Sequence, residues 1–302
     1  MRITLRRTVI FFSALVATSA VATVSFLAAW RVDLGDPLRI SANNWIGYAP
    51  LFYVKEKKWA RDDVLIVPVS SLVESEKLFQ AGMTDGFAGT QFEYFQGQTV
   101  SRTLIPKILV DRSNGADVIL SNVPLEKLKR TVREATVYLE MQTVNNSLFS
   151  AFVREYGLSH VRFRKIDRDQ VDLAATRDEG EPILLVTYEP YSTELVNRGF
   201  TEIASTKNVS LLVLDAVFID GDSLARRPGA AVALQDGLAR AISVLKEDPF
   251  GFYLTVRPYL KDQSYGEFIA ALEGIEWLVD EVSPELRASA KDIGVPLDWI
   301  ER

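Results

Sequence analysis

Short apolar runs alternate along this chain with longer segments in which hydrophobic residues recur every three to four positions. In the first third, the pattern predicts strands at 38–43, 63–69 and 85–88, and helices at 50–59, 71–82 and from 90 onward. Further strands are expected at 107–110 and 118–120. Strands that alternate with helices of this length are typical of parallel βαβ units. The pattern therefore predicts an α/β fold.

The same rhythm restarts after residue 120 and gives way to helices near the end. We expect helices at 124–130, 143–156 and 191–199, strands at 136–139, 161–166, 183–187, 211–214 and 216–219, and then helices at 228–246, 248–257, 266–279 and 284–292. We place crossovers near 118–123 and 208–216. This predicts one lobe of residues 37–120 plus 211–302 and a second of residues 121–210. Two lobes joined in this way usually close on a ligand by a hinge motion.

The N-terminus carries a hydrophobic segment of its own. Arg2, Arg6 and Arg7 precede an uncharged run from Thr8 to Trp30, and about 20 apolar residues are enough to span a membrane. We predict that residues 1–32 form a hydrophobic helix that acts as a signal anchor or signal peptide, with the basic flank in the cytoplasm. Ala20–Ala22 offers a cleavage site, but the length of the run favours a retained helix. The body would then lie in the periplasm, tethered to the inner membrane.

Composition removes several functional classes. The chain has 302 residues, a net charge of −6, no cysteine and a single histidine, His160. Most transition-metal sites and most acid–base chemistry near neutral pH use His or Cys, so we expect no catalytic residue, no metal and no cofactor. Acidic and basic residues are interspersed without a basic stripe, which predicts no nucleic-acid partner.

Several loops are expected to meet at one edge, because ligands of open α/β sheets bind outside the carboxyl ends of the strands. These loops are 43–48, 89–91, 111–117, 140–143 and 188–191. Trp45 and Tyr48 would supply flat apolar walls, while the helix starts at Thr90 and Thr143 would offer N–H groups to an anionic or carbonyl oxygen. An ordinary structural role stays open for each residue: both threonines fit N-caps, Glu189 fits a first-turn acid, and Trp45 fits a core position.

Five of these segments, taken in order, resemble a known family. Residues 45–51, WIGYAPL, look like the opening signature of periplasmic solute-binding proteins of the nitrate/sulfonate/taurine type. Residues 79–86, 111–117, 137–144 and 187–191 are similar to four later segments of that family. Three departures stand out: Trp30 occupies the place of the lipidated cysteine, Gln142 that of a glycine, and Tyr188 that of a tryptophan.

The resemblance implies the two-lobed periplasmic-binding-protein fold of type II, with a small-molecule ligand between the lobes. Carried over position by position, it gives as ligand-binding candidates Trp45, Tyr48, Thr90, Ser113, Glu140, Thr143, Glu189 and Asp215. Thiamine-pyrimidine synthases share this fold but depend on histidine and a cysteine-rich segment. This chain lacks those groups, so we expect a binding protein and not an enzyme.

The candidate loops are rich in carboxylates, and Arg112 is their only obvious cation. A desolvated carboxylate needs a cationic or donor partner, so a small amine, zwitterion or N-heterocycle fits better than a simple anion. We therefore predict an extracytoplasmic protein that captures such a molecule for import through an ABC permease. The alternative left open by the sequence is a membrane-anchored sensing subunit that signals to a membrane kinase or cyclase.

Overall fold

The computed structural model describes residues 36–60, 62–97, 102–279, 282–292 and 294–295. Residues 1–37 and 38–302 form separate units, and the account below concerns the second. The predicted hydrophobic helix at 1–32 lies outside the described residues. Within the described ranges, no helix combines the length and the apolar character needed to cross a membrane.

The first of two sheets has six strands in the order β11-β4-β10-β3-β1-β2. Its strands are β1 (Leu38–Ala42), β2 (Val64–Pro68), β3 (Gly86–Thr90), β4 (Leu104–Ser113), β10 (Val213–Asp220) and β11 (Ile275–Trp277). β1 runs parallel to β2 and β3, whereas β10 is antiparallel to both of its neighbours, β3 and β4. The late strand β10 thus lies between two strands from the first third of the chain.

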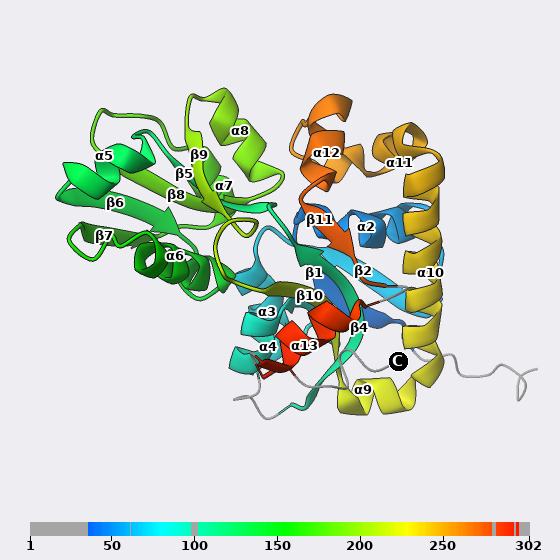
Figure 1. Ribbon diagram of the computed structural model, residues 1–302. Helices are drawn as coiled ribbons and strands as arrows, with labels where there is room; N and C mark the ends of the chain where they lie inside the picture. The colour runs from blue at the N-terminus through cyan, green and yellow to red at the C-terminus, as the bar shows by residue number, and fades with distance from the viewer. Residues whose placement is uncertain (1–35, 61, 98–101, 280–281, 293, 296–302) are drawn as a thin grey trace, which may run out of the picture. The chain divides into compact units, whose positions relative to one another are not determined.

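Helices cover both faces of this sheet (Figure 1). One core cluster joins it to α2 (Ala49–Glu56), α10 (Pro228–Glu247), α11 (Pro249–Val256) and α12 (Tyr265–Leu272). A second cluster joins it to α3 (Leu72–Gln80) and α13 (Pro284–Asp292), and α4 (Gln91–Gly97) packs on β3 and β10. The short α9 (Gly221–Arg226) follows β10 directly. We call this sheet and its helices the first lobe.

The second sheet has five strands in the order β7-β6-β8-β5-β9. They are β5 (Asp117–Ser121), β6 (Glu134–Leu139), β7 (Arg162–Asp167), β8 (Ile183–Tyr188) and β9 (Thr201–Ser205). Apolar residues of α5 (Leu125–Arg130) and α6 (Val144–Glu155) pack in one core cluster, and those of α7 (Gln170–Ala174) and α8 (Tyr191–Asn197) in another. This sheet and its helices form the second lobe.

Two segments connect the sheets, 114–116 between β4 and β5 and 206–212 between β9 and β10; we call them the hinge. Thr206 ties the two segments together. Its hydroxyl accepts a hydrogen bond from the Gly115 amide at 2.8 Å and shares another with the Ser113 hydroxyl at 2.9 Å, while its own amide donates to the Asp117 carbonyl at 3.0 Å. The lobe boundaries given above at residues 120 and 210 stay a prediction.

Several expected elements differ from the structure. The helix predicted for 266–279 ends at Leu272, because Gly274 approaches Ala116 so closely that a Cβ would lie 2.7 Å from the Ala116 nitrogen, and the chain then pairs with β4 as β11. Residues 213–220 form one strand where two were expected. α7, α9 and β9 were not predicted. The predicted parallel βαβ units are present, with β1 parallel to β2 and β3 and β6 parallel to β7 and β8. The antiparallel course of β5 and β10 was not predicted.

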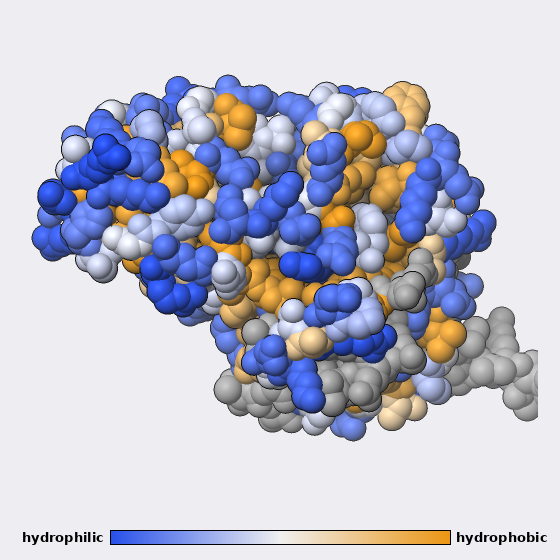
Figure 2. Space-filling model, viewed as in Figure 1, coloured by the Kyte–Doolittle hydropathy of each residue, from blue (hydrophilic) through white to orange (hydrophobic). Residues whose placement is uncertain are grey.

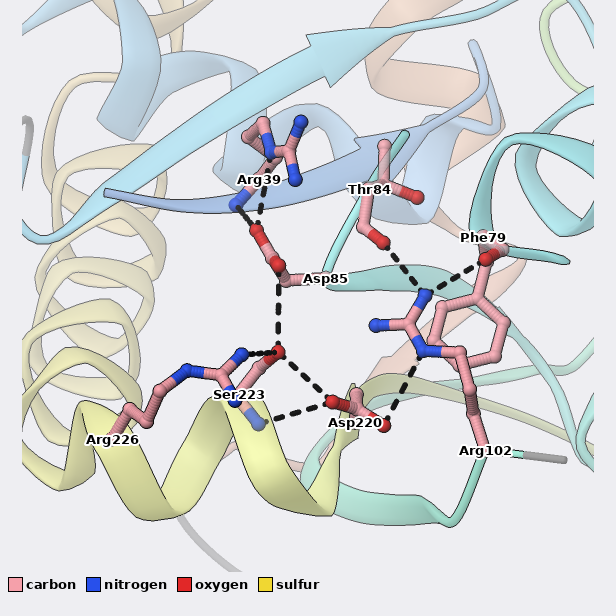
Figure 3. Close-up of polar contacts among 8 residues, drawn as sticks. All are labelled: Arg39, Phe79, Thr84, Asp85, Arg102, Asp220, Ser223 and Arg226. Atoms are coloured by element: carbon pink, nitrogen blue, oxygen red, sulfur yellow. Dashed lines mark hydrogen bonds and ion pairs between the residues drawn. The ribbon is translucent and has the colours of Figure 1, made fainter. Parts of the chain in front are cut away.

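A polar cluster joins β1, β3, β10 and α9 at the end of the first sheet where β3 begins and β10 ends (Figure 3). The Arg102 guanidinium donates to the carbonyls of Phe79 and Thr84 at 2.8 and 3.1 Å, and it lies 3.4 Å from the Asp220 carboxylate. It also stacks 4.2 Å above the Phe79 ring. Such a planar group with several fixed donors suits a buried junction of this kind.

The lobe surfaces seen in Figure 2 are mainly hydrophilic, and the hydrophobic residues visible there lie in patches between elements. This agrees with the burial of most large apolar side chains in the core clusters. The acids described next are therefore unusual for being buried with those apolar side chains.

Candidate functional site

The site begins at the turn after β1. Residues Ile46–Tyr48 form a short 3-10 helix that leads into α2, whose second residue is Pro50. A Cβ on Gly47 would lie 2.3 Å from both the Asp111 Oδ2 atom and the Trp45 Nε1 atom. Only glycine therefore allows this turn to pack against the end of β4.

This turn also contacts the second lobe directly. The Trp45 ring meets the Tyr188 ring edge to face, with centroids 5.7 Å apart. The Asn43 side-chain amide donates to the Tyr188 hydroxyl at 2.8 Å, and the Ile46 amide donates to the Glu189 carbonyl at 3.1 Å. The turn thus lies at the junction of the lobes.

A small cavity lies at this junction. Residues of both lobes line it: Asn43, Trp45, Tyr48, Leu72, Thr90, Asp117, Val144, Tyr188 and Asp215. The cavity has a volume of about 10 Å³, which is room for about one water molecule. The cavity is therefore closed in this arrangement of the lobes.

Two aspartates lie opposite each other on the floor of the site. Asp215 on β10 is paired in register with Asp111 on β4 and with Thr90 on β3. Side chains at opposed positions of neighbouring strands lie close together, and like charges there are destabilising. The Tyr48 hydroxyl donates to Asp215 Oδ1 at 2.5 Å, whereas Asp215 Oδ2 has no hydrogen-bond partner.

Burial raises the pKa of both aspartates well above the usual range. The charge of Asp111 raises the pKa of Asp215 further, and the charge of Asp117 raises that of Asp111. The Trp45 indole N–H lies near the Asp111 carboxylate and acts in the opposite direction, lowering the pKa of Asp111.

Asp117 lies close to this pair, and Glu140 of the second lobe lies near Tyr188. Burial raises the pKa of Asp117 to about 7, and the pKa of Glu140 on the second lobe to about 8. Glu140 Oε2 accepts from the Gln170 side-chain amide at 3.2 Å, and Glu140 Oε1 has no partner. If ionised, Glu140 would therefore have a hydrogen-bond donor on only one of its two carboxylate oxygens.

Glu93 differs from Asp111, Asp215 and Glu140 because both of its carboxylate oxygens accept hydrogen bonds. Its Oε2 atom accepts from the Thr90 amide at 2.8 Å and from the Thr90 hydroxyl at 2.5 Å. Its Oε1 atom accepts from the amide of Val144, in the other lobe, at 3.2 Å. Glu93 is fully buried, and desolvation raises its pKa.

No cation balances these carboxylates among the residues described. The buried polar residues of the described ranges include Glu93, Asp111, Asp117, Glu140 and Asp215, but no lysine, arginine or histidine. Asp220, which is also buried, pairs with the partly buried Arg102 away from this site. Arg112, the cation noted in the sequence, forms an ion pair with Glu276 at 3.2 Å. Over the same ranges, no three His, Cys, Asp or Glu residues are arranged to hold a metal ion.

The predicted candidates fall into three groups. Trp45, Tyr48, Thr90 and Asp215 line the cavity. Ser113, Glu140 and Thr143 are buried around it: Ser113 accepts from the Asp117 amide, and the hydroxyl of Thr143 donates to the Glu140 carbonyl and caps α6. The side chain of Glu189 points elsewhere, toward Thr193 and Gln263, and lines a separate cavity between α8 and α12.

Seven residues of the site were not among the candidates: Asn43, Leu72, Glu93, Asp111, Asp117, Val144 and Tyr188. A signal existed for most of them, because Asn43, Asp111, Asp117 and Tyr188 lie in loops that the sequence predicted to meet here. Glu93 completes the Thr90–Glu93 capping pattern. The closeness of Asp111 to Asp215 follows from the antiparallel insertion of β10, which the parallel pattern did not predict.

The comparisons with known proteins concern the fold. No protein-family model matches the sequence, and no curated protein matches it. Solved structures do match. The alkanesulfonate-binding protein SsuA from Xanthomonas axonopodis pv. citri, bound to MOPS, has a TM-score of 0.67 at 13% identity, over 86% of this chain and 92% of that one.

Two further structures give the same result. The periplasmic aliphatic sulphonate binding protein SsuA from Escherichia coli has a TM-score of 0.67 at 13% identity, over 89% of this chain and 94% of that one. A zinc-bound ligand binding component of an ABC-type import system from Staphylococcus aureus has a TM-score of 0.66 at 12% identity, over 89% and 97%. The predicted resemblance is confirmed at the level of the fold.

Proposed function

Since the chain has the two-sheet α/β fold of the periplasmic binding proteins, we propose that it is an extracytoplasmic receptor for a small organic molecule with a positively charged group. The ligand binds between the lobes, at the cavity walled by Trp45, Tyr48 and Tyr188. The loaded receptor delivers it to an ABC permease for import. The protein works by binding and has no catalytic role.

One observation carries the choice of ligand: buried carboxylates converge on the junction without a buried cation among the described residues. Removing a carboxylate from water is costly unless a cation or several donors replace the water. Asp111, Asp215 and Glu140 each keep at least one oxygen without a partner. A bound ammonium or a protonated nitrogen heterocycle would supply the missing charge and donors.

The aromatic walls favour an organic cation over a bare metal ion. A cation over the face of a tryptophan or tyrosine gains about 0.5–2 kcal/mol, more when desolvated. Trp45 and Tyr188 meet edge to face at the cavity. In this arrangement the cavity has no room for an organic molecule, so the lobes must part to admit the ligand.

The sulfonate ligands named for two of the similar structures do not transfer to this chain. At 13% identity those structures share the fold, and function resides in the site and not in the fold. Their role as binding proteins supports a receptor here, while the charge of this site supports a different ligand.

A matched series of ligands tests the proposal. Ethylammonium, taurine and ethanesulfonate share a two-carbon frame and carry a positive group, both charges, or a negative group. We expect isothermal titration of the full chain to show binding of ethylammonium or taurine, and none of ethanesulfonate. A ligand at a hundredfold excess over its Kd stabilises by about 2.7 kcal/mol, which raises the melting temperature by roughly 5–10 °C.

Asp215→Asn provides the matched variant, because it keeps the shape of the side chain and removes its charge. Binding of the cation should weaken at least tenfold, while an exposed change such as Glu126→Gln leaves it as in the wild type. Tight binding of ethanesulfonate by the wild type, unaffected by Asp215→Asn, would contradict the proposal.

A further inference from the structure

We propose that Glu93 is a resident counter-anion: from the first lobe it fills the anion-binding position at the N-terminus of α6 in the second lobe. The site therefore excludes an anionic group of a ligand from that position and accepts a cation instead. This deepens the proposed receptor function and rests on it for the sign of the ligand.

The N-terminus of α6 offers few free donors besides the one that Glu93 takes. The first amides of a helix have no partner within the helix and attract negative charge. In the twelve-residue α6, the Asn145 amide donates to the Thr143 hydroxyl and the Asn146 amide to the Thr143 carbonyl. The Val144 amide, beside the cavity, donates to Glu93.

The bonds of Glu93 exceed those of an ordinary cap. In a capping box the acid at the third helical position serves the backbone N–H of its own N-cap. Glu93 does this with Oε2, which accepts from Thr90. Its second oxygen crosses to the other lobe. One carboxylate thus satisfies a helix start on each side of the junction.

Glu93 also connects ligand selection to closure. The bond from Val144 joins the lobes, and opening them would leave a carboxylate with donors on one oxygen only. Two other bonds cross the junction: one from Gln96 of α4 to the Gln142 carbonyl just before α6, and one from Asn43 to Tyr188. Glu93 is the acidic residue among these bonds. Its carboxylate occupies the N-terminus of α6, where the helix amides would otherwise attract an anion of the ligand.

Glu93→Ala tests the proposal by emptying the position. In the full chain, we expect this variant to bind ethanesulfonate at least tenfold more tightly than the wild type, and acetate to raise its melting temperature as the anion replaces the lost carboxylate. Glu76→Ala is the matched control: it removes a buried glutamate of the same lobe whose hydrogen bond comes from Gln80. The control and the wild type should show neither effect. A Glu93→Ala chain that ignores both anions overturns the proposal.

Glu93→Gln keeps the test open where the alanine variant fails to fold, because it preserves the shape and removes the charge. The chain has no cysteine, so spin labels can be placed at Met83→Cys and Met141→Cys, two exposed positions on different lobes. We expect Glu93→Gln to broaden the distribution of distances between the labels toward longer values. An unchanged distribution overturns the proposal.

Neither measurement uses a cationic ligand. A wild type that binds no ethylammonium or taurine would therefore contradict the receptor proposal, while the response of the Glu93 variants to anions would still report on the resident counter-anion. Conversely, cation binding by the wild type with no anion response in the variants would overturn only the role of Glu93.

Discussion

Single residues of this protein depart from what stability alone would favour. Asp111 and Asp215 face each other on neighbouring strands, both are buried, and each keeps at least one carboxylate oxygen without a hydrogen-bond partner. Replacing such a buried acid by an uncharged residue often stabilises a fold. Sites of this kind are usually kept for function and are offset by well-packed regions elsewhere.

The first prediction at this scale concerns pH. Burial raises the pKa of Glu140 to about 8, so the folded state holds a proton that the unfolded state has lost. The free energy of unfolding should therefore fall as pH rises from about 4.5 to 8. We expect Glu140→Gln to flatten that fall and to gain on the order of 3 kcal/mol over the wild type at pH 8. Urea unfolding at pH 5 and pH 8 measures this, and equal pH profiles for the two proteins would refute it.

The second prediction concerns Gly47. Gly47→Ala would place a Cβ against Asp111 and Trp45, and overpacking of this kind costs about 1–3 kcal/mol. Thermal unfolding should show a lower melting temperature. Gly229→Ala is the control, since a Cβ there meets nothing within 4 Å; it should be neutral or slightly stabilising. A Gly47→Ala chain as stable as this control would show that the turn can relax.

At the scale of elements, the hinge depends on one side chain. The Thr206 hydroxyl links the two connecting segments by its bonds with Ser113 and Gly115. Gly115 has a φ of 126°, a conformation that favours glycine. The hinge thus combines a glycine, Gly115, whose backbone is conformationally free, with hydrogen bonds made by the Thr206 hydroxyl.

Removing these hydrogen bonds of Thr206 is the third prediction. Thr206→Val keeps the shape of the side chain but leaves the Gly115 amide and the Ser113 hydroxyl with a lost partner, at a cost of about 1–3 kcal/mol. Amide hydrogen exchange should become faster at residues 114–116 and 206–212. Thr206→Ser keeps the hydroxyl and should behave like the wild type. Unchanged exchange in the valine variant would remove Thr206 from the hinge.

Elements with a strong local signal were predictable from the sequence. The strand at 38–42, the helix from 72 with its Ser71 cap, and the helix of 228–247 lie close to their predicted bounds. β11 and the antiparallel placement of β10 were not predictable, because they depend on contacts between residues far apart in the chain. For the same reason the sequence pointed to Trp45, Tyr48 and Asp215 but not to Asp111 or Glu93, and it assigned Glu189 to the cleft although its side chain lies in another cavity.

At the scale of the whole unit of residues 38–302, binding and protonation are coupled. A bound cation favours the ionised form of the surrounding carboxylates and so lowers each pKa. Since burial raises the pKa of Asp117 to about 7 and that of Glu140 to about 8, binding near neutral pH should release protons.

The fourth prediction follows from that coupling. The affinity for ethylammonium should rise as pH increases from 6 to 8, by up to about tenfold per pH unit for each proton released. Isothermal titration in buffers of different ionisation enthalpy measures the number of protons, and Glu140→Gln should reduce it. An affinity that does not change with pH would indicate that these carboxylates do not face the ligand.

The closed cavity has a kinetic consequence. It has room for about one water molecule and therefore admits no ligand while the lobes stay together. Both binding and release of the ligand then require the lobes to separate. In stopped-flow mixing, the observed rate should level off at high solute concentration at the opening rate. The lifetime of the complex would then depend on the hydrogen bonds between the lobes as much as on the contacts between the protein and its ligand.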